Sequence, residues 1–277
     1  MAQVNNDPFD LEGKAIVVAG AGGGLGRAVV HALGARGAKL FLFDIDAERL
    51  AAVAGEVPGA RTMLADITDE AAMDAVTAAA REAFGRIDGA VNAAGLLPIE
   101  AATEMDADVF RRCQEVNVTG AFLFSRSLAK AMRAGADGHE SDHESDHESD
   151  HESDHESERG GGRIVHLASV SSFVANPGYA AYASSKGALA QLIRVLAREW
   201  AADRITVNGI GPALTETPLT HDYLGNPEFR SKAIEVIPMG RLGRPEDIVA
   251  MTLLLLAPGG AFVTGQIICV DGGRTLV

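Results

Sequence analysis

The chain has 277 residues, of which 47% are hydrophobic and 22% charged, a length and composition that suit one large α/β domain. It has no run of roughly 18 or more apolar residues, and Met1–Phe9 lacks the basic start and apolar stretch of a secretory signal, so we expect a cytoplasmic protein without a membrane span. Most of the formal net charge of −14 lies in residues 139–158, and taking away that segment's ten acids leaves −4, which gives no support to nucleic-acid or anionic-membrane binding.

Apolar, β-branched runs alternate along the chain with segments of helical period. The predicted strands are Lys14–Ala19, Lys39–Asp44, Thr62–Ala65, Gly89–Asn92, Arg163–Ala168, Ile205–Ile210 and Gln266–Val270. The predicted helices are Gly26–Ala35, Ala47–Ala54, Glu70–Phe84, Ala107–Met132, Ala181–Ala201 and Pro245–Leu256. Such alternation indicates a mostly parallel sheet with right-handed crossovers. We therefore predict a single doubly wound, Rossmann-type α/β domain, with a seven-stranded sheet and helices on both faces.

Residues 139–158 form five tetrads, four His-Glu-Ser-Asp followed by one His-Glu-Ser-Glu. The segment has no apolar residue that could join a core, so we expect a disordered insertion. It joins a predicted helix to a predicted strand, which places it at the edge of the sheet away from bound ligands. Histidines four residues apart could bind a metal weakly on a helical face, but ten like charges oppose a helix. No metal site is expected elsewhere.

A glycine-rich loop, Gly20-Ala21-Gly22-Gly23-Gly24-Leu25-Gly26, follows the first predicted strand and opens a helix. Glycines allow a tight turn and a close approach of the backbone to a pyrophosphate, which binds at the helix N-terminus. A glycine run alone could be a flexible turn, but here the flanking strand and helix are those that a dinucleotide site requires. The loop therefore predicts a nicotinamide dinucleotide as cofactor.

Asp44 ends the second predicted strand, 18 residues after Gly26. A carboxylate there can accept both ribose hydroxyls of NAD and repels the 2′-phosphate of NADP. Asp44 could instead cap the following helix, but Asp46 fits that cap better. No Lys or Arg lies in the glycine loop or directly after Asp44, so a 2′-phosphate would lack a partner. We therefore predict NAD.

Tyr182 and Lys186 stand four residues apart at the start of a predicted helix, and so on one face of it. A nearby ammonium lowers the pKa of a phenol toward the range that a general acid or base needs. Ser169 ends the preceding predicted strand, at the carboxyl edge of the sheet where ligands bind. Alone, such a pair is often a surface contact.

Together these motifs resemble the short-chain dehydrogenase/reductase family over about residues 11–273. The glycine loop with its Gly-x3-Gly-x-Gly spacing resembles the family's loop. Further matching motifs, in the family's order, are Asn92-Ala93-Ala94-Gly95, Val116-Asn117-Val118-Thr119-Gly120, Ser169, Tyr182 with Lys186, and Asp271-Gly272-Gly273. The resemblance implies an NAD-dependent dehydrogenase that interconverts a secondary alcohol and a ketone.

The resemblance also implies a role for four catalytic residues. Tyr182 would exchange a proton with the substrate oxygen, and Lys186 would lower the pKa of that phenol and bind the nicotinamide ribose. Ser169 would hold the substrate oxygen, and Asn117 would anchor a water in a proton relay. The family usually forms a homotetramer or homodimer, and the amphipathic helices at Ala107–Met132 and Ala181–Ala201 would pair between subunits.

By the same resemblance the cofactor would contact a set of residues that mostly follow strand ends. Asp66 would contact the adenine, although capping of the helix from Glu70 is an equal alternative for it. Thr217 would hold the carboxamide. The full expected set is Gly20, Gly24, Leu25, Gly26, Asp44, Asp66, Ile67, Asn92, Ala93, Gly95, Tyr182, Lys186, Pro212, Thr215 and Thr217.

Substrate selection is expected in the loop after Gly95, in Val170–Tyr179 and in a lid over Leu219–Gly240. These segments are mostly apolar, with His221 and Glu100 as the obvious ionisable groups, which favours an uncharged cyclic or aryl-alkyl alcohol or ketone. The resemblance also permits a 3-oxoacyl thioester reductase, against which Asp44 and the acidic surface argue. Two other classes are a non-catalytic NAD sensor, which would not need the catalytic set, and a metal buffer built on the repeat, which leaves most of the chain unexplained.

Overall fold

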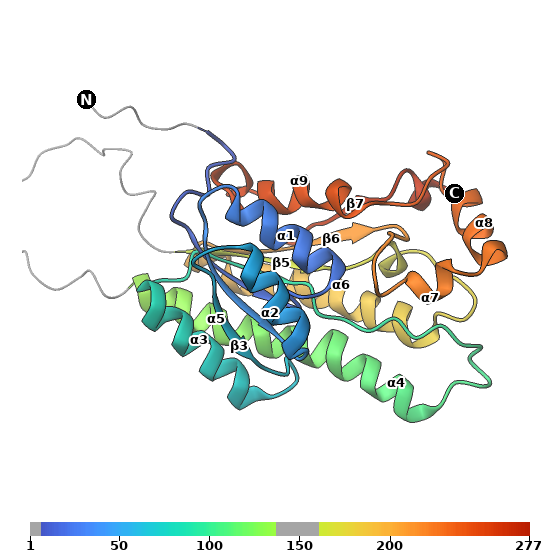
Figure 1. Cartoon of the computed structure of the whole chain (residues 1–277), viewed down its shortest axis with the longest axis horizontal. Coiled ribbons are helices and arrows are strands. Elements are labelled where there is room, and N and C mark those ends of the chain that lie inside the picture. The colour runs from blue at the N-terminus through green and yellow to red at the C-terminus, as the bar shows by residue number, and fades with distance from the viewer. Residues whose placement is uncertain (1–6, 137–160) are drawn as a thin grey trace, which may run out of the picture.

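The computed structural model describes residues 7–136 and 161–277, so residues 139–158 and the expectation of disorder there lie outside the described residues. In the described chain a seven-stranded sheet has the order β3-β2-β1-β4-β5-β6-β7, and every neighbouring pair is parallel. Its strands are β1 (Ala15–Ala19), β2 (Lys39–Asp44), β3 (Arg61–Leu64), β4 (Gly89–Asn92), β5 (Gly162–Leu167), β6 (Ile205–Pro212) and β7 (Ile267–Val270). The predicted single Rossmann-type fold is confirmed (Figure 1).

Helices cover both faces of the sheet. Strand residues point alternately to opposite sides, so each face has its own core cluster. Val17 and Ala19 of β1 join one core cluster, with side chains from α3 (Glu70–Phe84), α5 (Ala121–Ala136) and α6 (Ala180–Trp200). Ile16 and Val18 join the other cluster. The helices of that second face are α1 (Gly24–Gly34), α2 (Ala47–Glu56) and α9 (Pro245–Leu256). Continuous apolar runs in the sequence therefore correspond to strands buried on both sides.

Two aspartates that follow strands begin the next helix. The Asp46 side chain accepts the N–H groups of Glu48 and Arg49 at the start of α2, as predicted. The Asp69 side chain does the same at the start of α3. Asp66 is therefore not the cap of α3, and the capping alternative for that residue is wrong.

The predicted helix Ala107–Met132 is not continuous. The structure divides it into α4 (Ala107–Gln114), a π-helical turn at Glu115–Gly120, and α5. A π turn holds one more residue than an α turn and shifts the side chains that follow. Here Gly120 comes so close to the segment after β3 that a Cβ would lie 2.9 Å from Cγ2 of Ile67. Sequence periodicity predicted one helix through the whole segment and therefore missed this change.

The expected lid contains two short helices that sequence periodicity did not predict, α7 (His221–Leu224) and α8 (Pro227–Glu235). The side chain of Asn226 caps α8 by accepting the N–H groups of Glu228 and Phe229. Both helices lie at one end of the molecule, and the end of α5 and the start of β5 lie at the other (Figure 1). In the described chain no helix is long and apolar enough to cross a membrane.

Candidate active site

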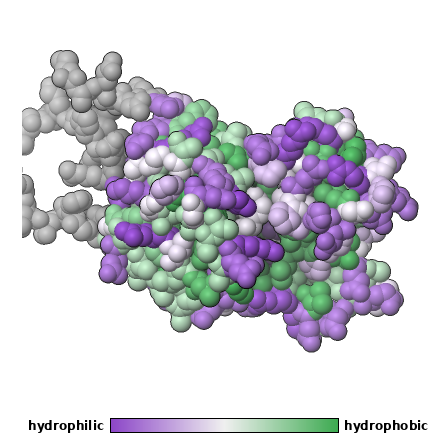
Figure 2. Space-filling view, in the orientation of Figure 1, coloured by the Kyte–Doolittle hydropathy of each residue, from purple (hydrophilic) through white to green (hydrophobic). Residues whose placement is uncertain are grey.

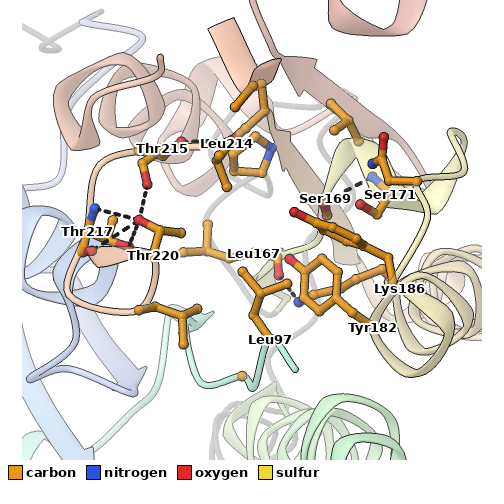
Figure 3. Close-up of a pocket in the computed structure, with 18 of the residues that line it drawn as sticks. Leu97, Leu167, Ser169, Ser171, Tyr182, Lys186, Leu214, Thr215, Thr217 and Thr220 are labelled. Carbon is orange, nitrogen blue, oxygen red and sulfur yellow. Dashed lines mark hydrogen bonds between the residues drawn. The ribbon is translucent and has the colours of Figure 1, made fainter. Parts of the chain in front are cut away.

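A cavity of about 360 Å³ opens at the carboxyl ends of β4, β5 and β6. The segments that follow these strands form much of its wall, together with the start of α6 and the lid. Most lining side chains are apolar, and a few polar ones converge on the cavity, which is the usual composition of a small-molecule site. Ser169, Tyr182 and Lys186 lie on one side, facing Thr215, Thr217 and Thr220 on the other (Figure 3).

The two residues of the predicted acid/base pair are brought together by the first turns of α6. Lys186 is buried, and its Nζ lies 5.6 Å from the centre of the Tyr182 ring. The same Nζ donates a hydrogen bond of 2.7 Å to the main-chain oxygen of Leu167, at the end of β5. Ser169 stands two residues further on, and its Oγ accepts the N–H of Ser171 at 3.0 Å. The sheet edge thus holds both the ammonium and the serine hydroxyl in place beside the phenol.

Burial controls the ionisation of this pair. It raises the pKa of Tyr182 to about 12, against the lowering effect of a hydrogen bond with Ser169. Burial also lowers the pKa of Lys186 to about 8. The expected lowering of the phenol pKa by Lys186 is therefore outweighed by desolvation in the chain alone, and near neutral pH the phenol keeps its proton.

Asn117 lies in the π-helical turn and is buried behind the cavity wall. Its Oδ1 accepts the N–H of Leu96 at 2.8 Å, and its Nδ2 donates to the Leu96 oxygen at 3.0 Å and to Oγ of Ser185 at 2.9 Å. The side chain therefore ties the loop after β4 to α6. A Cβ on Gly95 would lie 3.3 Å from Oδ1 of Asn117 and 3.8 Å from Nζ of Lys186, so this loop passes tightly over the catalytic pair.

The glycine loop has the form of a phosphate cradle. Gly20 has a φ of +66°, and a Cβ there would lie 2.6 Å from the main-chain nitrogen of Ala94. A Cβ on Gly24 would lie 2.8 Å from Cβ of Thr217. No side chain caps the N-terminus of α1, so its first N–H groups are left for an anion. This arrangement fits the pyrophosphate of a dinucleotide. Leu25, in the same loop, lines the cavity.

The end of β2 lies beside this loop. Oδ2 of Asp44 accepts the N–H of Gly22 at 2.9 Å, and Oδ1 accepts the N–H of Asp46 at 3.0 Å. A Cβ on Gly22 would lie 2.6 Å from Cβ of Arg49, so a cation that sequence reasoning missed packs next to the loop. Arg49 forms an ion pair of 3.1 Å with Asp46.

The other expected cofactor contacts fall into two groups. Ala93, Gly95, Pro212, Thr215 and Thr217 line the cavity. Gly20, Gly24, Gly26, Asp44, Asp66, Ile67 and Asn92 do not line it, but most lie in or next to the glycine loop and the ends of β2, β3 and β4. Asp66 accepts the N–H of Thr68 at 2.9 Å and pairs with Arg112 at 3.2 Å. Burial raises the pKa of the Asp66 carboxyl, but the hydrogen bonds from Thr68 and Arg112 together outweigh burial and hold that pKa below the usual range.

A buried histidine that sequence reasoning missed, His166, connects β4 and β5 to the first turn of α5. Nδ1 of His166 lies 3.3 Å from Nδ2 of Asn92, whose Oδ1 accepts the N–H of Ala94. Nε2 of His166 lies 2.9 Å from Oγ of Ser125, which itself donates to the oxygen of Ala121 at 2.7 Å. The ring thus accepts at Nδ1 and donates at Nε2, and burial lowers the pKa of His166 to about 3. A lone histidine in an apolar strand gave no signal of this role.

Thr220, which sequence reasoning did not single out, stabilises the cavity wall opposite Tyr182. Oγ1 of Thr220 donates to the main-chain oxygen of Thr215 at 2.7 Å and accepts the N–H of Thr217 at 3.1 Å, so it fixes the turn after β6 (Figure 3). Beyond this turn, the cations Lys232 and Arg274 also line the cavity. Neither His221 nor Glu100, the ionisable groups expected from the sequence, is among the described residues of its wall.

Comparisons with known proteins agree with this geometry. Residues 14–139 match the family model described as short chain dehydrogenase, and residues 152–275 match one described as Enoyl-(Acyl carrier protein) reductase. Galactitol 2-dehydrogenase (L-tagatose-forming) of Cereibacter sphaeroides is 37% identical over 97% of each chain. A 2-(S)-hydroxypropyl-CoM dehydrogenase of Xanthobacter autotrophicus is 34% identical over 96% of this chain and 98% of its own.

The solved structures similar to this chain include a putative NAD(P) dependent gluconate 5-dehydrogenase from Beutenbergia cavernae with bound NADP. It superposes with a TM-score of 0.83 at 31% identity and covers 98% of this chain and all of its own. Fold, motif order and relatives therefore agree along nearly the whole chain. The chain belongs to the short-chain dehydrogenase/reductase family and is an oxidoreductase that acts on the CH–OH group of secondary alcohols.

Proposed function

We propose that Tyr182 is the acid/base of the reaction, assisted by Lys186 and Ser169, and that NAD is the preferred cofactor. The observation that carries the proposal is the convergence of these three side chains on one wall of the cavity. The cavity wall next to them is formed by Gly95, on the loop that Asn117 ties to α6. No other tyrosine of the described chain has a lysine ammonium over its ring.

The residues have distinct roles in alcohol oxidation. The dinucleotide supplies the hydride acceptor when bound. Tyr182 first loses its own proton to solvent and as tyrosinate takes the hydroxyl proton, and Ser169 donates a hydrogen bond to the substrate oxygen as negative charge develops on it. Lys186 has a pKa of about 8, so it is mostly protonated at neutral pH, and its charge stabilises tyrosinate. In ketone reduction the same phenol returns the proton.

The cofactor would be held by the glycine loop, by Asp44 and by the turn that contains Thr217. The uncapped N-terminus of α1 favours a pyrophosphate. Asp44 supports NAD over NADP, because a carboxylate beside the loop repels a 2′-phosphate, and the nearby Arg49 is already paired with Asp46. Asn117 is a positioning residue whose side chain acts through the Leu96 backbone.

The substrate is proposed to be a secondary alcohol with an apolar group next to the carbinol carbon, because Leu96, Leu97 and Val170 line the cavity near the catalytic side chains. One relative is named for a polyol, galactitol, so both kinds of alcohol belong in the first substrate panel. A 3-oxoacyl thioester reductase is not favoured, since the first curated relatives are named as dehydrogenases of alcohols.

A homotetramer is proposed as the assembly. Val109, Phe110, Phe122 and Val195 on α4, α5 and α6 are exposed, and a second copy of this face would cover them. On the side of the molecule that Figure 2 shows, hydrophobic and hydrophilic residues are mixed. Light scattering of the purified protein tests the assembly, and a monomer would contradict it.

The test of the reaction is reduction of NAD, followed near about 340 nm, with a panel of polyols and aryl-alkyl alcohols. Tyr182→Phe is expected to lower the rate at least about a hundredfold, because it removes the acid/base and leaves the ring. Tyr223→Phe is the matched control, since Tyr223 does not line the cavity and its hydroxyl donates to the main-chain oxygen of Leu97. Equal rates in both variants, or a preference for NADP, would contradict the proposal.

A further inference from the structure

The charged side chains on the cavity wall are all cationic. Among the described residues they are Lys186, Lys232 and Arg274, and no Asp or Glu lines the cavity. This contrasts with the protein as a whole, which has 38 acidic residues and 24 lysines and arginines. Lys186 is part of the acid/base pair, so two cations remain without a role. A site lined by one sign of charge concentrates ligands of the opposite sign.

A tight turn brings Arg274 back to the cavity after β7. Gly272 and Gly273 have φ values of +60° and +91°, and Asp271 holds the turn by accepting the N–H groups of Gly273 and Thr275 at 3.0 and 2.8 Å. The nearest acid in sequence is thus bound to the turn itself. No ion pair of Arg274 with an aspartate or glutamate is found in the described chain.

The guanidinium of Arg274 is held in place by two oxygen atoms. Nη2 donates to Oδ1 of Asn176 at 2.9 Å, and Nη1 donates to the main-chain oxygen of Val277 at 3.2 Å. Asn176 belongs to the β5–α6 loop and also lines the cavity. Because a guanidinium has five N–H donors, three remain for a ligand, in a planar fork that matches a carboxylate.

Lys232 contributes less. It lies on α8 and pairs with Glu228 at 2.7 Å, and both side chains are more than two-thirds exposed. Solvent therefore screens its charge, and Glu228 offsets much of it. Arg274 is the half-buried cation, on the wall formed by the post-β7 turn and the β5–α6 loop.

We propose that the substrate carries a carboxylate, which Arg274 binds while the carbinol lies between Tyr182 and Ser169. The apolar residues between these two ends would contact the hydrocarbon that joins the carboxylate to the carbinol. This inference rests on the proposed function, because it uses the same cavity and assigns the end of the substrate that does not react. It replaces the uncharged substrate expected from the sequence, which took only His221 and Glu100 as ionisable candidates.

The test compares methyl ketones that end in a carboxylate with their methyl esters, using chains with two to five methylene groups between the ends. Binding is measured by calorimetry on Tyr182→Phe protein with NADH present, so that no turnover intervenes. At least one acid is expected to bind about tenfold more tightly than its ester. Adding Arg274→Gln should abolish this preference, and Arg274→Lys should restore part of it.

Arg36→Gln is the matched control, because Arg36 is exposed, lies outside the cavity wall and has a side chain that donates to the Ala32 oxygen at 3.4 Å. It should keep the full acid preference. The inference is overturned if no acid binds more tightly than its ester, or if Arg274→Gln weakens acid and ester equally. Wild-type NADH oxidation is followed with the same panel. Acid-selective binding without turnover would refute the proposed function alone, and turnover without acid selectivity would refute this inference alone.

Discussion

Replacement of His166 by leucine tests whether the buried network is formed by a neutral ring. The substitution removes both ring nitrogens at a fully buried position of β5. Nδ2 of Asn92 then loses its hydrogen-bond acceptor, whereas Ser125 still donates to the Ala121 oxygen. Leaving one buried amide donor unsatisfied and losing one further hydrogen bond costs about 2 to 3 kcal/mol of unfolding free energy. We expect a loss of that size at pH 7.5.

The same variant should have a flatter dependence of stability on pH. The native ring of His166 is neutral down to about pH 3, because burial lowers its pKa. In the unfolded chain the ring takes up a proton below about pH 6.5. The unfolded state thus binds more protons, so the contribution of His166 is complete above pH 6.5 and is lost as the pH falls. At pH 5.0 the free energy of unfolding of the wild type should be lower by about 2 kcal/mol because of this residue, whereas the variant should show no such loss.

The assay is urea denaturation followed by circular dichroism at pH 7.5 and pH 5.0, with equal m-values as the check on a shared transition. The free-energy gap between wild type and His166→Leu should narrow by about 2 kcal/mol at the lower pH. His221→Leu is the control, because His221 is exposed on α7. A gap that stays constant or widens at pH 5.0 would refute the neutral, buried ring.

Three further predictions follow from backbone and carboxylate contacts. Gly20→Ala should lower the melting temperature by several degrees, because a left-handed backbone at alanine and the clash with Ala94 together cost about 2 kcal/mol. An unchanged melting temperature would contradict the close approach of Gly20 to Ala94. Asp44→Asn should raise KM for NAD about tenfold and leave KM for NADP equal or lower, which steady-state kinetics with both cofactors can check. Asp247→Asn should lower the free energy of unfolding by about 1 kcal/mol at pH 7, because hydrogen bonds from Arg241 lower the pKa of Asp247 to about 2. The wild type loses this contribution as the pH falls from about 4 to 2, so the acid unfolding curves of wild type and variant should converge there.

Much of the fold follows from signals that are local in sequence. The apolar runs at β1 and β2 are continuous because both faces are covered, and the glycine loop between β1 and α1 is recognisable from spacing alone. Tyr182 and Lys186 are four residues apart, so a helical pattern suffices to place them on one face. These parts of the site could be predicted because each depends on neighbours within a turn or two.

Other parts depend on contacts between residues far apart in the chain. Asn176 and Arg274 are 98 residues apart, and nothing near either residue shows that they meet. The partners of His166 lie on two other elements, so its sequence context is only that of a buried strand. The short helix α8 begins at Pro227 and buries no residue fully, so it lacks the apolar period that identifies longer helices.

The π-helical turn makes the helical segment from 107 to 136 more sensitive to its length than to many of its side chains. Residues before the turn face α6, where Gln114 donates to the Ala181 oxygen, and residues after it face α3, where Ser127 donates to Asp74. Inserting or deleting one residue in α4 or in the first turns of α5, with the π turn kept, would rotate one half against the other by about 100°. Either the loop that Asn117 holds or the packing on α3 would then be lost. In a family of such enzymes, insertions and deletions should accordingly be rare on both sides of this turn.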